Sequence, residues 1–196
     1  EQVRENCARN SRPFEYAFLL DALKAEQAQG ITIDTARCFF HTEKRDYMVN
    51  DAPGHIEFLK NMVTGAARAE AALLVIDAEE GIQENSKRHG YILSMLGLRQ
   101  VAILVNKMDL VDYDQSVYER IRSEFTVFLA NIGVHNPSFI PISARTGANM
   151  TKHSDEMPWY DGKSVLDMIE SFEKAAGETE RPFRMPVQDI YKFTDD

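Results

Sequence analysis

Apolar residues recur along this chain with two alternating periods, one typical of strands and the other typical of helices. Residues 14–29 have helical spacing in their first half. Two runs with strand character follow, TARCFFHT and RDYMVND, and the polar pair Glu43 and Lys44 separates them. Further on, we predict alternating strands at 71–77, 101–106 and 139–144 and helices at 56–70, 84–96, 115–132 and 164–175. This βα repetition predicts an α/β fold with a mainly parallel sheet and helices on both faces.

The strand predicted at 71–77, AALLVID, is almost wholly apolar, as a strand buried on both sides requires. In sheets of this kind, ligands bind at the carboxyl ends of the strands. Short polar motifs follow three of the predicted strands: NDAPGH at 50–55, NKMD at 106–109 and SA at 143–144. We therefore expect these motifs to share one rim of the sheet.

Composition limits the number of domains, the kinds of partner and the cellular compartment that we expect for this chain. The chain has 196 residues, 44% of them hydrophobic, so it can bury one sizeable core and we expect one main domain. A formal net charge of -9 argues against nonspecific affinity for nucleic acid or an anionic membrane, and no apolar run is long enough to cross a bilayer. Cys7 and Cys38 are too few for a disulfide scaffold, which favours a reducing, cytoplasmic compartment.

The NDAPGH segment combines residue types suited to sensing a phosphate. Asp51 can hold Mg²⁺ through water, because this ion keeps most of its hydration shell and needs only one or two anionic anchors. Pro53 and Gly54 turn the chain, and a glycine N–H can approach a phosphate oxygen without a side chain intervening. His55 would stand beside that phosphate and orient an attacking water. The alternative interpretation is a tight turn with a helix-capping aspartate.

The NKMD segment is suited to reading guanine. The Asp109 carboxylate can accept hydrogen bonds from the N1–H and the exocyclic amino group of guanine, a pattern that adenine does not offer. Asn106 would tie neighbouring loops together and bond the base, while the aliphatic stem of Lys107 would cover one face of the ring. The alternative interpretation is a solvated loop after a strand.

Two weaker motifs extend this set. In GITID, at 30–34, the Thr32 hydroxyl could ligate Mg²⁺ and its backbone N–H could reach a γ-phosphate. Ser143 and Ala144 would present backbone N–H groups to the guanine oxygen. Each motif alone is a weak signal, and the order GITID, DAPGH, NKMD, SA along one chain is the specific one.

With these motifs in this order, the chain resembles the GTP-binding domain of translation-factor-type GTPases, from about KAEQAQGITID to its last residues. The resemblance implies a P-loop GTPase-type three-layer α/β fold with GTP and Mg²⁺ as cofactors. In that family the threonine matching Thr32 binds Mg²⁺, and the aspartate matching Asp51 holds the ion through water. The glycine matching Gly54 senses the γ-phosphate, and the histidine matching His55 positions the hydrolytic water. The resemblance thus implies GTP contacts from Thr32, Asp51, Ala52, Pro53, Gly54, His55, Asn106, Lys107, Met108, Asp109, Ser143 and Ala144.

One departure from the family pattern concerns the phosphate loop G-x-x-x-x-G-K-[ST], which should precede GITID and does not. The nearest match, MPWYDGKS at 157–164, has Met157 in place of the first glycine, bulky residues where small ones belong, and no preceding strand. We reject it as a phosphate loop. Because the chain also starts without a Met, we expect it to lack the N-terminal strand and phosphate loop of the domain.

Within the family, QENSKRHGYILSMLGLRQVAILVNKMDLVDYDQ and MPWYDGKSVLDMIE most resemble the GTPase subunits of sulfate adenylyltransferases. This resemblance implies a small catalytic subunit as partner and allows a fused adenylylsulfate kinase. The alternative is an elongation factor that delivers aminoacyl-tRNA, but those factors usually carry an insertion where this chain has only a short loop between Ile76 and Glu84. A second alternative is a nucleotide-free interaction module. The missing phosphate loop supports it, and the joint presence of Thr32, Asp51, His55 and Asp109 opposes it.

The remaining features complete the domain plan. We expect a GTP-binding domain at 1–175, a polar linker at 176–182, and the first strand of a β-barrel domain at 183–196. Asp77 also follows a strand, but AEEG comes next instead of a proline-glycine-histidine sensor, so we assign it to capping. The histidines without metal-ligand spacing, expected at the surface, are His41, His89, His135 and His153.

Overall fold

The computed structural model describes residues 35–67, 69–174 and 185 of the chain. The helical spacing at 14–29, the GITID loop with Thr32, the linker at 176–182 and nearly all of the strand predicted at 183–196 lie outside the described residues. The division into domains therefore stays a prediction.

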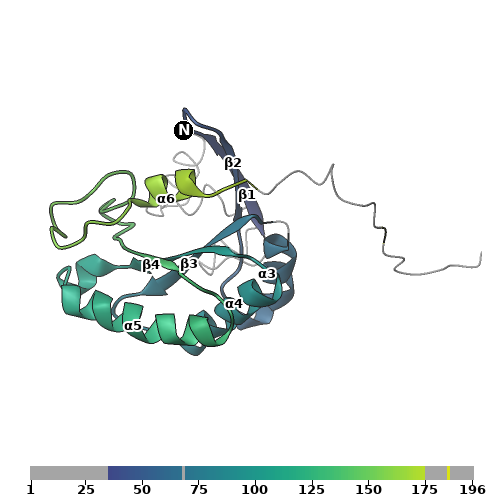
Figure 1. Cartoon of the computed structure of the whole chain (residues 1–196), viewed down its shortest axis with the longest axis horizontal. Coiled ribbons are helices and arrows are strands. Elements are labelled where there is room, and N and C mark those ends of the chain that lie inside the picture. The colour runs from purple at the N-terminus through teal and green to yellow at the C-terminus, as the bar shows by residue number, and fades with distance from the viewer. Residues whose placement is uncertain (1–34, 68, 175–184, 186–196) are drawn as a thin grey trace, which may run out of the picture.

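Two β-sheets organise the described residues (Figure 1). Strands β1 (Ala36–His41) and β2 (Asp46–Asp51) form an antiparallel hairpin, as the two runs with strand character predict. Strands β3 (Ala71–Asp77), β4 (Gln100–Asn106) and β5 (Ser138–Pro141) pair in parallel in that order. The five strands predicted within the described residues and the parallel sheet are confirmed, although β5 ends earlier than predicted.

The helices follow the predicted pattern with shorter ends. Those of the described residues are η2 (Ile56–Phe58), α3 (Leu59–Ala66), α4 (Glu84–Met95), η3 (Met108–Val111), α5 (Gln115–Asn131) and α6 (Val165–Ser171). The Asp114 carboxylate accepts the N–H of Ser116 at 2.7 Å and so caps the start of α5. None of the helices in the described part of the chain has the length and apolar character that crossing a bilayer requires.

The parallel sheet is the middle of three layers. On one face, Ile103 and Val105 of β4 pack with Phe125 and Leu129 of α5 in a core that also contains residues of α3 and α4. Gly90 lets α4 approach α5, because a Cβ there would lie 3.1 Å from Cε1 of Phe128. On the opposite face, Ala102 and Leu104 of β4 and Ile140 of β5 pack with Val165 and Met168 of α6. Figure 1 shows α5 and α6 on opposite sides of the sheet.

Strand β3 departs from the prediction that it is buried on both sides. Leu73 is 38% exposed and Val75 is 57% exposed, whereas Leu74 and Ile76 are buried. The register places Leu73 beside Ala102 and Val75 beside Leu104, on the face that α6 covers. Because α6 has only seven residues and packs on β4 and β5, the corresponding face of β3 is left uncovered by the described residues. For these residues the prediction is wrong.

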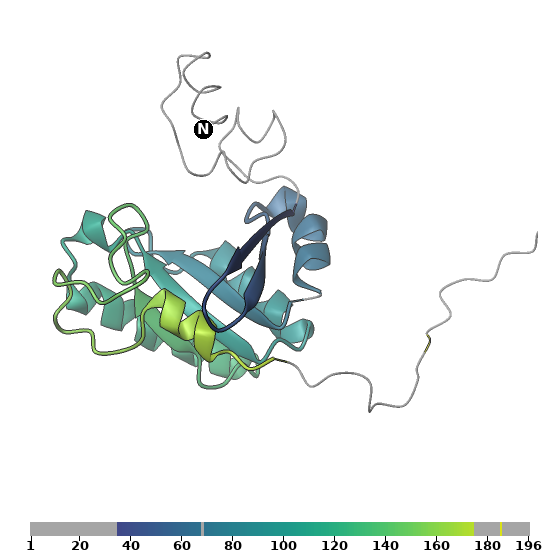
Figure 2. The ribbon, with the colours of Figure 1, turned by 90° about the horizontal axis from the view of Figure 1, so that it is seen from above.

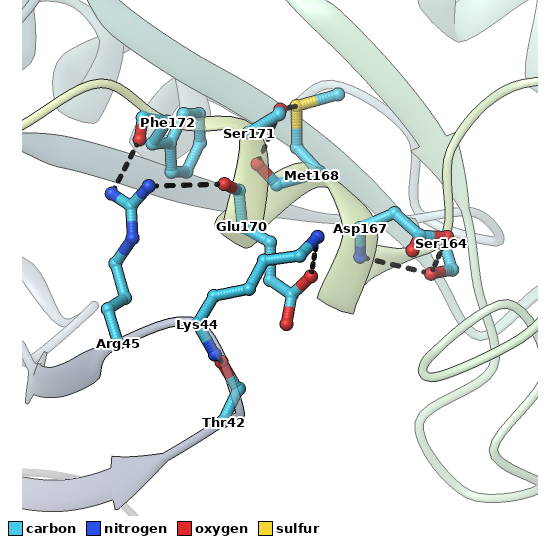
Figure 3. A network of polar contacts seen from close by, with 9 residues as sticks. All are labelled: Thr42, Lys44, Arg45, Ser164, Asp167, Met168, Glu170, Ser171 and Phe172. Carbon is cyan, nitrogen blue, oxygen red and sulfur yellow. Dashed lines mark hydrogen bonds and ion pairs between the residues drawn. The ribbon is translucent and has the colours of Figure 1, made fainter.

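The tip of the β1–β2 hairpin is fastened to the end of α6 (Figure 2). Arg45 donates from Nη1 to the Phe172 carbonyl at 2.8 Å and from Nη2 to the Glu170 carbonyl at 3.5 Å (Figure 3). These carbonyls belong to the helix end, where intrahelical partners are missing. Lys44 adds an ion pair with Glu170 at 2.5 Å. At the other end of the hairpin, the Asn50 side chain donates to the Gly65 carbonyl of α3 at 3.2 Å.

Replacement of Arg45 by alanine in the full-length protein tests this fastening. The loss of two hydrogen bonds at the helix end should raise amide hydrogen exchange in β1, β2 and α6 about fivefold, as expected from roughly 1 kcal/mol of lost hydrogen bonding. Arg37→Ala, at an exposed arginine of the same hairpin, is the matched control. Equal exchange in both variants would show that Arg45 does not hold the tip.

Candidate functional site

Asn106 joins two loops at the carboxyl end of the parallel sheet. It is the last residue of β4, and its side-chain Oδ1 accepts the N–H of Ala144 at 3.0 Å. Ala144 follows β5, so this bond links the loops after two neighbouring strands, as the sequence predicts. The amide oxygen of Asn106 therefore has a structural partner already.

Lys107 is held toward the neighbouring strand. Its Nζ lies 2.5 Å from Oδ2 of Asp77, the last residue of β3. Asp77 Oδ1 accepts the N–H groups of Glu79 at 2.8 Å and Glu80 at 3.3 Å, which confirms its predicted capping role. Burial alone would raise the pKa of Asp77, but the bonds from Lys107, Glu79 and Glu80 lower it below its ordinary value. The hydrogen bond with Asp77 and the charge of that carboxylate raise the pKa of Lys107.

The rest of NKMD divides between the core and the surface. Met108 is fully buried, and its N–H donates to the Ile142 carbonyl at 3.1 Å, so the side chain belongs to the core and only the backbone is near the rim. Asp109 is half-buried in η3. Among the described residues, no hydrogen bond or ion pair engages its carboxylate. None of the described residues therefore occupies this carboxylate, which can accept hydrogen bonds from a ligand.

Ser143 and Ala144 use their backbone N–H groups within the chain. The N–H of Ser143 donates to the Ala148 carbonyl at 3.3 Å, and that of Ala144 donates to Asn106. The Ser143 hydroxyl is buried and accepts the N–H of Thr146 at 3.2 Å. In this structure the two residues hold the loop after β5 in place, while the donor role expected for their N–H groups would need those groups to change partner.

The sensor segment, residues 51–55, lies at the end of β2. In the described residues β2 belongs to the two-stranded hairpin, so the expectation that this motif shares the rim of the parallel sheet is wrong for them. Asp51 closes the strand, Ala52 packs against the main core, and Pro53 is buried. A Cβ added to Gly54 would lie 3.9 Å from Cε1 of His89 in α4. Burial lowers the pKa of His89 below its ordinary value, and a hydrogen bond with the Gly54 backbone opposes this only in part. His89 is thus half-buried beside Gly54 and less exposed than the surface position that we predicted.

His55 is exposed and bonded to its own turn. Its Nδ1 accepts the N–H of Glu57 at 3.4 Å, and its ring lies 6.0 Å from that of Phe58. The Glu57 carboxylate is 3.9 Å from the same nitrogen, too far for a hydrogen bond.

The MPWYDGKS segment has a structural role that explains its residues. Met157 is buried in the core, and the Tyr160 ring leaves no room for a Cβ on Gly162. Ser164 is buried and caps α6, accepting the N–H of Asp167 at 3.1 Å. No strand directly precedes the segment among the described residues, which agrees with our rejection of it as a phosphate loop.

The described residues offer few ligands for a magnesium ion, as is usual where the ion binds together with a nucleotide. Within residues 35–67 and 69–174, no group of three or more histidine, cysteine or acidic side chains could hold a metal by itself. Asp51 is a single carboxylate at a strand end, and Mg²⁺ in phosphate sites takes one or two protein oxygens and completes its shell with water and phosphate. The donor set is therefore compatible with Mg²⁺ that arrives with a nucleotide.

A parallel α/β sheet with an Asn-Lys-x-Asp loop after β4, together with an antiparallel hairpin whose strand β2 runs into an Asp-x-Pro-Gly-His turn, defines a GTPase-type nucleotide-binding domain. The family described as the elongation factor Tu GTP binding domain matches residues 1–175. The chain belongs to this family of translation-factor-type GTPases.

The individual relatives include both sulfate adenylyltransferase subunits and elongation factors. Sulfate adenylyltransferase subunit 1 from Laribacter hongkongensis is 44% identical over 174 residues, which cover 89% of this chain and 36% of that protein. Elongation factor 1-alpha from Methanopyrus kandleri is 41% identical over 182 residues, which cover 92% of this chain and 43% of that protein. The chain thus spans less than half of either relative. Among solved structures, bacterial selenocysteine-specific elongation factor EF-Sec matches with a TM-score of 0.63 and 25% identity, covering 79% of this chain and 25% of that one.

Proposed function

We propose that this chain is the GTP-binding and hydrolysing domain of a sulfate adenylyltransferase GTPase subunit, which couples GTP hydrolysis to the formation of adenylylsulfate from ATP and sulfate. The observation that carries the GTP-binding part of the proposal is the strand-end cluster, defined as Asp77, Asn106, Lys107 and Ala144. Its contacts fix the loop that presents Asp109 at the carboxyl edge of the sheet.

Guanine selection follows from the chemistry of this loop. The Asp109 carboxylate accepts from the N1–H and the amino group of guanine, while Asn106, whose oxygen is held by Ala144, keeps its NH₂ group for the base. The Lys107 stem covers the ring. Met108 anchors the loop from below, and Ser143 and Ala144 close it from the side of β5.

The phosphate side is assigned to the sensor segment and Thr32. Thr32 and Asp51 would hold Mg²⁺, which neutralises phosphate charge when it is bound. The backbone of Ala52, Pro53 and Gly54 contacts the phosphates, with Gly54 as the γ-phosphate sensor. His55 then orients the attacking water, for which its exposed ring has to turn from Glu57 toward the nucleotide.

The sulfate adenylyltransferase assignment rests on the short connection after β3. The Gly81 N–H donates to the Asp77 carbonyl at 2.9 Å, and α4 begins at Glu84, so a tight turn replaces any insertion there. A small catalytic subunit is the partner under this proposal, a fused adenylylsulfate kinase is compatible with it, and the cytoplasm is the compartment. An elongation factor that carries aminoacyl-tRNA is the second candidate, supported by the 41% identity to elongation factor 1-alpha.

The base assignment predicts the effect of Asp109→Asn in the full-length protein. An amide offers the base a donor where the carboxylate accepted, so preference should shift from GTP toward xanthosine triphosphate, which has a carbonyl where guanine has an amino group. Competition binding between the two nucleotides measures the shift, with Asp112→Asn on the same loop as control. Unchanged preference for GTP would remove Asp109 from the base pocket.

The mechanism predicts that His55→Ala separates binding from hydrolysis. GTP affinity should stay nearly constant, while the hydrolysis rate of the full-length protein with its small partner subunit falls at least about tenfold, or roughly 1.4 kcal/mol in the barrier. Adenylylsulfate synthesis should fall with it. His135→Ala, at an exposed histidine outside the motifs, controls for the loss of an imidazole.

The two candidate functions separate in the same experiment. A wild-type complex that hydrolyses GTP, shows no GTP-stimulated adenylylsulfate formation and binds aminoacyl-tRNA would contradict the sulfate assignment and favour the elongation factor. A loss of GTP binding in His55→Ala equal to the loss of hydrolysis would contradict the water-orienting role.

A further inference from the structure

We propose that Asp77 is a positioning residue of the guanine site, which holds the Lys107 side chain in the place where its stem covers the base. This inference rests on the proposed function. It concerns a residue that the sequence assigns only to capping and that no motif of the chain includes.

The geometry gives the two carboxylate oxygens separate partners. Oδ1 takes the N–H groups of Glu79 and Glu80, and Oδ2 takes Nζ of Lys107 at 2.5 Å. The Asp77 side chain is 16% exposed and that of Lys107 is 51% exposed, so the acceptor is fixed in the protein while the lysine stem runs along the surface. With both oxygens engaged, Asp77 is placed to orient a side chain and not to ligate an ion.

The register of the sheet brings the pair together. Asp77 lies directly opposite Asn106 in the β3–β4 ladder, so Lys107 is the first residue beyond that pair. Its backbone is left-handed, with φ of 64°, a conformation that a side-chain-bearing residue adopts at some energetic cost. Met108 on one side donates to Ile142, and Asn106 on the other accepts from Ala144. The backbone of the loop is thus fixed at both flanks, and Asp77 fixes the end of the side chain.

An ordered lysine stem favours binding for an entropic reason. A long surface side chain samples many rotamers, and immobilising one on binding costs about two- to tenfold in affinity. If Asp77 holds Nζ before the nucleotide binds, part of this entropy is already lost on folding. GTP and GDP have the same base, so the affinity for each should increase equally, while the rate of hydrolysis should not change.

Asp77→Asn in the full-length protein separates the two contacts. The asparagine oxygen still accepts from Glu79 and Glu80, but the charge that attracts Lys107 is gone. We expect the dissociation constants of GTP and of GDP to rise about threefold each, with kcat at saturating GTP unchanged. Asp114→Asn is the matched control, because Asp114 likewise accepts the N–H two residues on and has no lysine partner among the described residues.

A double-mutant cycle assigns the effect to Lys107. In a Lys107→Met background, Asp77→Asn should cause no further loss of GDP affinity. A full additional loss there, or unchanged GDP affinity of Asp77→Asn in the wild-type background, would overturn the positioning role while leaving guanine binding itself in place. Failure of the wild-type protein to bind either guanine nucleotide would instead overturn the proposed function, and the inference with it.

Discussion

The parallel pairing of β3, β4 and β5 in one register is the constraint on which the site depends. It sets Asp77 opposite Asn106 and brings the end of β5 alongside Val105, so that three loops leave the sheet at one edge. Side-chain contacts then tie these loops together, from Asp77 to Lys107 and from Asn106 to Ala144. Without this register, the same residues would be dispersed polar groups at the ends of unrelated strands.

The two parts of the site are supported differently. The loop with Asp109 stands on the main core, through buried Met108 and Ile142. The sensor segment continues from a two-stranded hairpin that is fastened at its tip by Arg45 and Lys44 and at its base by Asn50. The sensor segment contacts the main domain through Ala52, which packs against the core, and through Gly54, which lies beside His89 of α4. The segment assigned to the γ-phosphate thus belongs to a smaller sheet than the segment assigned to the base.

The period of apolar residues predicted the βα order, the antiparallel hairpin and the parallel strands. The polar motif after β4 predicted the hydrogen bond from Asn106 to a neighbouring loop. These local signals could not predict what depends on packing between distant segments. The exposure of Val75 follows from how little of the sheet the short α6 covers, and an apolar run looks the same whether or not a helix lies on it. Likewise, His89 and Asp77 acquire their partners only when α4 and β3 are set beside Gly54 and Lys107.

The central claim is that the carboxyl edge of the parallel sheet selects guanine. The most direct test is an equilibrium titration of the full-length protein with GDP and with ADP under identical conditions, with Mg²⁺ present. GDP should bind at least about 100-fold more tightly than ADP, roughly 2.7 kcal/mol, because Asp109 accepts from two donors that adenine does not present together. Equal affinity for the two nucleotides, or no binding of GDP, would contradict it.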